Sequence, residues 1–179
     1  MLDKNSTALV IIDVQERLMN VIFEKEKLIQ NLVKLIEGAK VLGLPIIWTE
    51  QYPKGLGETI PELKSILEEI KPIEKIHFSC CGEPNFRFEL EKVSAHTLLV
   101  AGIESHVCVY QTVADLIDSS FQVEVVTDAI SSRTKESREL GIKKCNDLGA
   151  SLTSVEMCLF ELLEQAGTFE FKAISKIVK

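Results

Sequence analysis

Three residues of types that do chemistry, Asp13, Lys75 and Cys108, fall at or near the ends of short apolar runs. Cys108 follows the run at residues 97–101, close to a helical pattern that starts near His106. The N-terminus of a helix carries partial positive charge and free N–H groups, and both favour a thiolate, the reactive form of cysteine. Cys108 is therefore a candidate nucleophile that needs a base and a group to hold an oxyanion.

Asp13 and Lys75 are candidate partners of this thiol, and each has a second interpretation. Asp13 ends the apolar run 8–12, where its carboxylate either caps the residues that follow or acts as a general base. A lysine in a short strand-like stretch is more often a solvated edge residue. If Lys75 instead points into a crevice, its charge favours both the Asp13 carboxylate and a Cys108 thiolate. The residues alone leave both alternatives open.

Other reactive side chains are weaker candidates. His106 stands two residues before Cys108, and side chains two apart on a helix diverge, so we do not expect it to be the base. Cys80 and Cys81 are adjacent and lack the C-x-x-C spacing of zinc sites, and no histidine has partners at metal-ligand spacing. We predict no metal site.

The composition fits one globular domain. The chain has 179 residues, 46% of them hydrophobic and 26% charged, which is enough for a substantial core. A net charge of −7 disfavours a nucleic-acid partner, and no apolar run has the length of a membrane span. The N-terminal residues lack signal-peptide features, which predicts a cytoplasmic protein. Five cysteines are an odd count, so we expect no disulfide scaffold and place Cys145 and Cys158 in the core.

Apolar runs alternate with helical patterns along the whole chain. Strands are expected at 8–12, 45–49, 97–101, 123–127 and 150–153, with a weaker signal at 71–79. Helices are expected at 25–42, 61–70, 85–92, 106–119, 135–148 and 155–165, a loop at 51–61, and a tail at 169–178 that is helical or pairs with another subunit.

This alternation predicts a single α/β domain over residues 1–179, with three αβα layers. Its six-stranded, mostly parallel sheet has the order 3-2-1-4-5-6, which places Asp13 and Cys108 across the crevice at the switch point. The fold is Rossmann-like without a nucleotide site, because no glycine-rich turn follows the first strand.

Three separated segments together resemble the isochorismatase-like hydrolase superfamily, also called the cysteine hydrolases. They are residues 8–15, Lys75 standing four residues before Ser79, and residues 102–108. The resemblance implies that Asp13 is the general base, Lys75 the catalytic lysine and Cys108 the nucleophile. Segments 49–57 and 128–133 are similar to the isochorismatase domain-containing proteins within this superfamily.

The same resemblance implies further features. It implies self-association as dimers or larger rings, and a cis peptide bond between Ile103 and Glu104. It also implies an oxyanion hole formed by the backbone N–H groups of Glu104 and Cys108. The nicotinamidase branch binds a metal through an Asp-x-His segment after the second strand, but this chain has Glu-Gln-Tyr at 50–52, so neither a metal nor another cofactor is expected. Cys81 stands where the family often has phenylalanine.

These observations predict a metal-independent cysteine hydrolase that cleaves a small amide through a thioester, acts on a small-molecule substrate, and binds neither nucleic acid nor membrane. The candidate pocket residues are Trp48, Glu50, Tyr52, Phe78 and His106, although Trp48 also fits a core position.

Three alternatives remain open. The first alternative is a binding or scaffold protein with a silent site. The second is a ribonuclease, an activity proposed for some relatives, although the acidic net charge of the chain disfavours RNA binding. The third is a redox sensor in which Cys80 or Cys81 resolves an oxidised Cys108.

Overall fold

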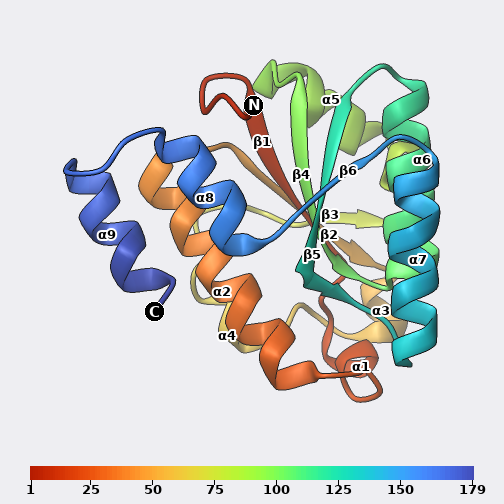
Figure 1. Cartoon of the computed structure of the whole chain (residues 1–179). Coiled ribbons are helices and arrows are strands. Elements are labelled where there is room, and N and C mark those ends of the chain that lie inside the picture. The colour runs from red at the N-terminus through yellow and green to blue at the C-terminus, as the bar shows by residue number, and fades with distance from the viewer.

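The computed structural model describes residues 1–179 and contains one six-stranded sheet (Figure 1). Every neighbouring pair of strands is parallel, and the order is β3-β2-β1-β4-β5-β6. The predicted α/β class and strand order are therefore confirmed. The strands are β1 (Thr7–Ile12), β2 (Ile46–Gln51), β3 (Ile73–Lys75), β4 (Thr97–Ile103), β5 (Gln122–Ser131) and β6 (Ser151–Thr153).

Helices cover both faces of the sheet (Figure 1). One layer consists of α2 (Lys25–Leu42), α8 (Val155–Leu163) and α9 (Phe169–Ile177), with the short α4 (Pro61–Lys64) beside α2. The other consists of α5 (Pro84–Val93), α6 (Tyr110–Asp118) and α7 (Lys135–Asp147). The one-turn helices α1 (Glu16–Met19) and α3 (Pro53–Leu56) lie near the carboxyl ends of the strands.

The two central strands explain the apolar runs of the sequence. Every residue of β1 and β4 is buried, because helices cover both faces of a parallel sheet. Cys145 and Cys158 are fully buried in the core, as predicted. The tail forms α9, the helical one of its two alternatives, and packs on α2.

Several boundaries differ from the predicted ones. The helix expected at 61–70 ends at Lys64, and the chain continues in turns to Ile70, whose carbonyl accepts the Trp48 indole N–H. The expected loop at 51–61 contains α3. The helix expected to start near His106 is instead a π-helical turn, Ser105–Val109, that leads into α6.

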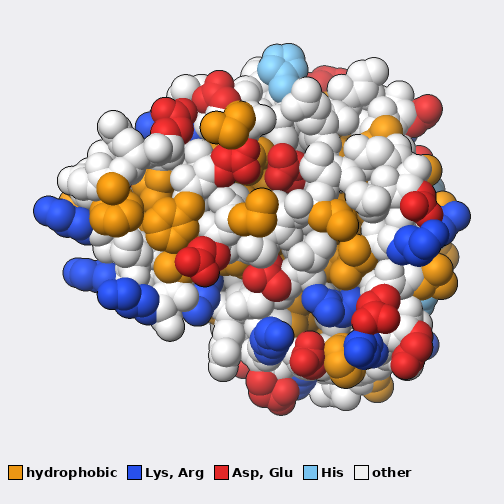
Figure 2. Space-filling view, viewed as in Figure 1, with side chains coloured by type: hydrophobic (Ala, Val, Ile, Leu, Met, Phe, Trp, Pro, Cys, Tyr) orange, Lys and Arg blue, Asp and Glu red, His pale blue; other side chains and the backbone are white.

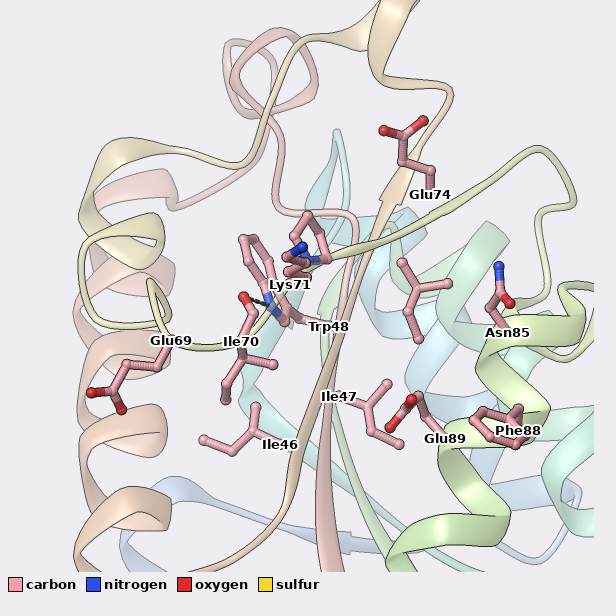
Figure 3. A pocket seen from close by; sticks show the side chains of 12 residues that line it. Ile46, Ile47, Trp48, Glu69, Ile70, Lys71, Glu74, Asn85, Phe88 and Glu89 are labelled. Atoms are coloured by element: carbon pink, nitrogen blue, oxygen red, sulfur yellow. Dashed lines mark hydrogen bonds between the residues drawn. The ribbon is translucent and has the colours of Figure 1, made fainter.

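The outer edge of β2 is only partly covered. β3 has three residues and pairs with Thr49–Gln51, so Ile46–Trp48 pair with β1 on the inner side but have no strand partner on the outer side. A cavity of about 670 Å³ lies along this open part of the edge. Figure 3 shows Trp48 and Ile70 on one side of the β2 ribbon, and Ile47 and Phe88 on the other.

On the face shown in Figure 2, acidic and basic side chains are interspersed, and basic ones gather at the left over α9. None of the helices combines the length and the apolar character that a membrane span needs.

Candidate active site

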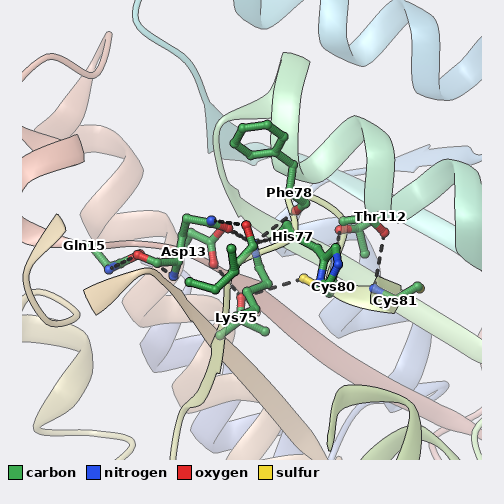
Figure 4. Close-up of polar contacts among 12 residues, drawn as sticks. Asp13, Gln15, Lys75, His77, Phe78, Cys80, Cys81 and Thr112 are labelled. Atoms are coloured by element: carbon green, nitrogen blue, oxygen red, sulfur yellow. Dashed lines mark hydrogen bonds and ion pairs between the residues drawn. The ribbon is translucent and has the colours of Figure 1, made fainter. Parts of the chain in front are cut away.

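A fully buried ion pair joins two of the predicted residues. Lys75 Nζ lies 2.7 Å from Asp13 Oδ2, and neither side chain has any exposed surface (Figure 4). Asp13 follows β1 in the middle of the sheet, whereas Lys75 ends the edge strand β3. β2 lies between them, so the lysine side chain reaches across one strand to the carboxylate. Lys75 therefore points into the molecule, and the interpretation as a solvated edge residue is wrong.

Oxygen atoms surround the Lys75 ammonium group. Besides Asp13 it donates to Gln51 Oε1 at 2.7 Å and to the backbone carbonyls of His77 and Phe78 at 3.2 and 3.0 Å. Burial is the largest single effect and opposes the positive charge, but the Asp13 carboxylate, Cys80 and Cys108 together outweigh it, and the pKa of Lys75 is raised above its ordinary value. Lys75 is therefore a charged group at neutral pH despite its burial.

The Asp13 carboxylate is fixed on both of its oxygens. Thr49 Oγ1 donates to Oδ1 at 2.7 Å, while Lys75 holds Oδ2. The backbone of Asp13 is left-handed, with φ at 51°, and its side chain does not cap α1, whose N-cap Gln15 makes no side-chain capping bond. Because the side chain is engaged by Lys75 and Thr49 instead, the alternative role as a helix cap does not hold.

Gln51, Thr49 and Gln15 are polar residues of the site that the sequence analysis missed. Gln15 and Gln51 form a pair, in which Gln15 Nε2 donates to the Gln51 carbonyl at 2.9 Å and Gln51 N donates to Gln15 Oε1 at 2.7 Å. Thr49 and Gln51 are two residues apart on β2, so their side chains point to the same face of the sheet, where they contact Asp13 and Lys75. The sequence signal for these residues is the spacing of two between polar side chains on the strand next to the one that ends at Asp13.

Cys108 lies in the π-helical turn after β4, with 7% of its surface exposed. Its thiol is close enough to Asp13 and Lys75 for both charges to act on it, and burial together with the Asp13 carboxylate raises its pKa while Lys75 opposes the rise. The expectation that a helix N-terminus would favour the thiolate is wrong for the resting site. Burial and a neighbouring negative charge outweigh that effect.

Cys80 is a second thiol beside this cluster. Its Sγ lies 3.7 Å from Thr49 Oγ1, and its backbone N–H donates to Thr112 Oγ1 at 3.0 Å. Thr112 lies about one helical turn after Cys108. Burial raises the pKa of Cys80 to about 12. The pKa of Cys81, by contrast, is raised to about 11 by burial and by the charge of the Asp115 carboxylate.

The loop between β4 and Cys108 has an unusual backbone. The peptide bond between Ile103 and Glu104 is cis. The Glu104 carbonyl accepts the N–H of Val107 at 3.1 Å and of Val109 at 3.2 Å, and the second bond spans five residues, as in a π-helix. The N–H of Glu104 itself donates to no acceptor within the chain.

Among the five expected pocket residues, Tyr52 pairs with Lys75 through its backbone N–H, which donates to the Lys75 carbonyl at 2.8 Å. It lines a cavity of about 290 Å³ together with Lys75 and Ile76. Phe78 is exposed and contributes its backbone carbonyl to Lys75. His106 is half-buried, and its Nδ1 lies 2.9 Å from the Oγ of Ser132, the residue after β5.

Trp48 and Glu50 do not line this site. The Glu50 carboxylate accepts the N–H and the hydroxyl of Thr59, at 2.7 and 2.8 Å. Trp48 is buried, as its core interpretation predicted, and lines the separate cavity at the β2 edge (Figure 3). Both alternate along β2 with Thr49 and Gln51, and therefore face the other side of the sheet.

Comparison with known proteins relates the chain to a family. The model of the isochorismatase domain matches residues 7–157. The secreted isochorismatase effector Isc1 of Phytophthora sojae is 36% identical and the alignment covers 98% of this chain and 85% of that protein. Isochorismatase domain-containing protein 2 of Xenopus laevis is 34% identical, with coverage of 99% and 85%.

Solved structures agree with this relationship. The MAR1 ribonuclease of Caenorhabditis elegans has a TM-score of 0.93 and 37% identity, over 99% of this chain and 91% of that one. YcaC of Pseudomonas aeruginosa, solved with covalent acrylamide, has a TM-score of 0.92 and 25% identity, with coverage of 98% and 90%. YcaC of Escherichia coli, an octameric hydrolase of unknown specificity, has the same TM-score and identity, with coverage of 98% and 89%. Family membership supports a hydrolase, and this chain belongs to the isochorismatase family.

Proposed function

We propose that this protein is a metal-independent cysteine hydrolase that cleaves a small amide, with Asp13, Lys75 and Cys108 as its catalytic residues. The observation that carries the proposal is the buried Lys75–Asp13 ion pair, 2.7 Å long, with the Cys108 thiol under the influence of both charges. A buried ion pair is weak evidence for stability, because desolvation offsets its attraction. Beside the Cys108 thiol, however, the ion pair offers both a carboxylate that can take the thiol proton and a cation that can stabilise the thiolate.

Asp13 takes the proton of the Cys108 thiol, and the thiolate that forms is stabilised by the Lys75 ammonium group. The thiolate attacks the amide carbonyl carbon, and negative charge moves to the carbonyl oxygen. The free N–H of Glu104 and the N–H of Cys108 bind this oxyanion. Collapse of the intermediate breaks the C–N bond, Asp13 returns the proton to the leaving amine, and a thioester remains. Water activated by Asp13 then releases the acid and the free thiol.

The raised pKa of Cys108 fits this sequence of steps. A thiol that remains protonated in the resting site needs a base at the moment of attack, and Asp13 is the carboxylate that raises its pKa. The structure of YcaC with covalent acrylamide adds support, since an amide-bearing electrophile forms a covalent adduct in that relative.

Chemical labelling tests the nucleophile. With iodoacetamide and peptide mass mapping, we expect Cys108 to be alkylated before the other four cysteines, and Asp13→Ala to slow this labelling. Cys81 is a built-in control, because it is buried and is acted on by a carboxylate, Asp115, and a cation, Arg87, that are separate from the Asp13–Lys75 pair. Equal labelling of Cys108 and Cys81, or no effect of Asp13→Ala, would contradict an activated nucleophile.

A screen of small amides in a thermal-shift assay tests for a silent binding protein. Amides that raise the melting temperature without being hydrolysed by the unmodified protein would indicate binding without catalysis. Hydrolysis that is lost in Cys108→Ser would support the enzyme.

A ribonuclease is the second candidate, because a related structure at 37% identity is the MAR1 ribonuclease of Caenorhabditis elegans. RNA binding would require basic side chains on the surface, and its affinity would fall steeply with salt. The net charge of −7 gives this candidate less support than the amidase. Cleavage of a labelled RNA that disappears in Cys108→Ser would favour it.

We also propose that the chain self-associates, as the octameric YcaC of Escherichia coli does. Light scattering after gel filtration measures the mass directly, and a mass equal to the 20.0 kDa chain would contradict this proposal. The cytoplasmic location stays a prediction, since one relative is a secreted effector.

A further inference from the structure

The residues that follow β5 contact the loop at residues 104–108, which leads to Cys108, through their side chains. The backbone pairing of β4 with β5 continues to Gly102–Ile130 and Ile103–Ser131 and stops there. Beyond it, Arg133 Nε and Nη2 donate to the two carboxylate oxygens of Glu104, at 2.8 and 3.3 Å. Side chains therefore continue the connection between the strands where the backbone hydrogen bonds end.

Ser132 binds the next two residues of the loop. Its Oγ lies 2.6 Å from Ser105 Oγ and 2.9 Å from His106 Nδ1. Ser132 and Ser105 are fully buried. We call Ser132 and Arg133 the β5 clamp, because together they hold three consecutive residues of the loop that leads to Cys108.

The clamp is itself anchored. Ser131 Oγ donates to the carbonyl of Phe23 at 2.7 Å, and the N–H of Phe23 donates to the carbonyl of Ser132 at 2.8 Å. On its other side, Thr134 caps α7 by accepting the N–H of Ser137 at 3.1 Å. A segment fixed at both ends can impose its geometry on the loop it contacts.

We infer that Arg133 and Ser132 are positioning residues for the oxyanion donor and the nucleophile, an inference that rests on the proposed cysteine chemistry. The two parallel hydrogen bonds of Arg133 fix the orientation of Glu104, whose N–H has no acceptor in the chain. Arg133 is 63% exposed while the Glu104 side chain is 8% exposed, so the pair joins the surface to the buried loop. Solvent around the exposed arginine screens the attraction, so the pair contributes less to stability than a fully buried one. Its use here is to aim the free N–H at the substrate oxygen.

Two small reagents separate this role from a general structural one. Iodoacetamide alkylates a thiolate by displacing iodide, and no charge develops on its carbonyl oxygen. Acrylamide adds the thiolate to its C=C bond, the electron pair moves onto the carbonyl oxygen, and a proton then restores the amide. Only the acrylamide reaction uses an oxyanion donor, and the two reagents are similar in size.

In Arg133→Ala we expect the rate of Cys108 modification by acrylamide to fall about tenfold, a fraction of the effect of deleting a donor outright. The rate with iodoacetamide should change less than about twofold, because that reaction does not use the Glu104 N–H. Arg133→Lys should recover only part of the acrylamide rate, since lysine cannot form two parallel bonds. In a Glu104→Gln background the effect of Arg133→Ala should shrink, because the ion pair is already weakened.

Lys143→Ala is the matched control, since Lys143 forms an exposed ion pair with Asp147 on α7, at 3.0 Å. It should leave both rates unchanged. Equal loss of both rates in Arg133→Ala, or no loss of either, overturns the clamp. If Cys108 of the unmodified protein reacts with iodoacetamide no faster than Cys81, the proposed function fails. If Cys108 reacts selectively and the ratio of the two rates is the same in Arg133→Ala, the clamp alone fails.

Discussion

Lys75 is the residue on which the site depends most. Its ammonium group has four oxygen acceptors within 3.2 Å, and one of them carries a full negative charge. An ammonium group offers donors from a single point, which suits acceptors gathered around it, whereas the planar guanidinium of arginine does not. In the proposed mechanism the same ion pair supplies a base for the Cys108 thiol and a cation for the thiolate.

Asp13→Asn should destabilise the fold strongly, because it leaves the Lys75 ammonium group buried without a counter-charge. We expect the free energy of unfolding to fall by about 3–5 kcal/mol, the usual cost of breaking a buried pair. Urea denaturation measures the change. Asp147→Asn, which breaks an exposed pair with Lys143, should cost less than about 1 kcal/mol. Similar losses in the two variants would show that burial does not set the strength of the Lys75 pair.

Gln51→Ala should weaken the hold on Lys75 without removing the ion pair. It deletes the 2.7 Å hydrogen bond between the charged Lys75 Nζ and Gln51 Oε1, while Asp13 and the carbonyls of His77 and Phe78 remain as acceptors. We expect a loss of about 1–3 kcal/mol in unfolding free energy and slower iodoacetamide labelling of Cys108. Gln51→Glu replaces the acceptor by a carboxylate and should retain the bond. An unchanged labelling rate in Gln51→Ala would assign Gln51 a purely local role.

The positions of Asp13, Lys75 and Cys108 at element ends could be predicted from the sequence, because apolar runs mark buried strands. The direction of the Lys75 side chain could not, since a three-residue edge strand gives no periodic signal. The pKa of Cys108 could not be predicted either. It depends on burial and on a carboxylate from another strand, and both require the folded sheet.

At the scale of elements, the close approach of β1 and β4 brings the residues after the two strands near each other. Gly102 of β4 has φ at 114°, and a Cβ at this position would overlap the carbonyl of Ile12, the residue before Asp13. The two central strands therefore approach closely just before the segments that carry Asp13 and Cys108.

Gly102→Ala should distort this point. The new Cβ would meet backbone atoms of Ile12 and would also require a left-handed conformation that alanine adopts reluctantly. We expect a loss of more than about 2 kcal/mol in unfolding free energy, above the ordinary range for a glycine-to-alanine change. Gly43→Ala is the control, because it has φ at 71° but open space around its Cβ. Equal losses would mean that the backbone angle, and not the contact, sets the cost.

Element types were predictable and some boundaries were not. The helical pattern after β4 correctly predicts a helix, but a sequence does not distinguish a π-helical turn from an α-helical one, and the first turn is π-helical. The strand expected at 123–127 extends to Ser131, because Asp128 does not end it: the Asp128 carboxylate accepts the N–H of Val155 at the start of α8.

At the scale of the whole molecule, all five thiols are buried and none forms a disulfide. Burial raises the pKa of Cys81 and Cys145 to about 11 and of Cys158 to about 12, from an ordinary value of 9.0. Folding therefore keeps protons on groups that the unfolded chain releases at moderately alkaline pH.

This difference predicts a loss of stability at alkaline pH. A raised native pKa means that the folded state binds more protons than the unfolded state above the unfolded value, so stability falls as pH rises past it. We expect the urea midpoint to be constant up to about pH 8 and to fall clearly by about pH 10. Cys145→Ala should make the fall shallower, because one buried thiol is removed. A midpoint independent of pH over this range would contradict the burial of the thiols.

The three-residue strand β3 has a consequence for the dynamics of the molecule. It lies at the edge of the sheet and carries Lys75, whose partner Asp13 is 62 residues away in sequence. Short edge strands are segments that open locally at a lower free energy than the core. Opening of β3 would withdraw the ammonium group and admit water to Asp13 while β1 and β4 stay paired. Native-state hydrogen exchange should therefore detect an intact fold with a transiently dismantled site, and Lys75 should set the free energy of that opening.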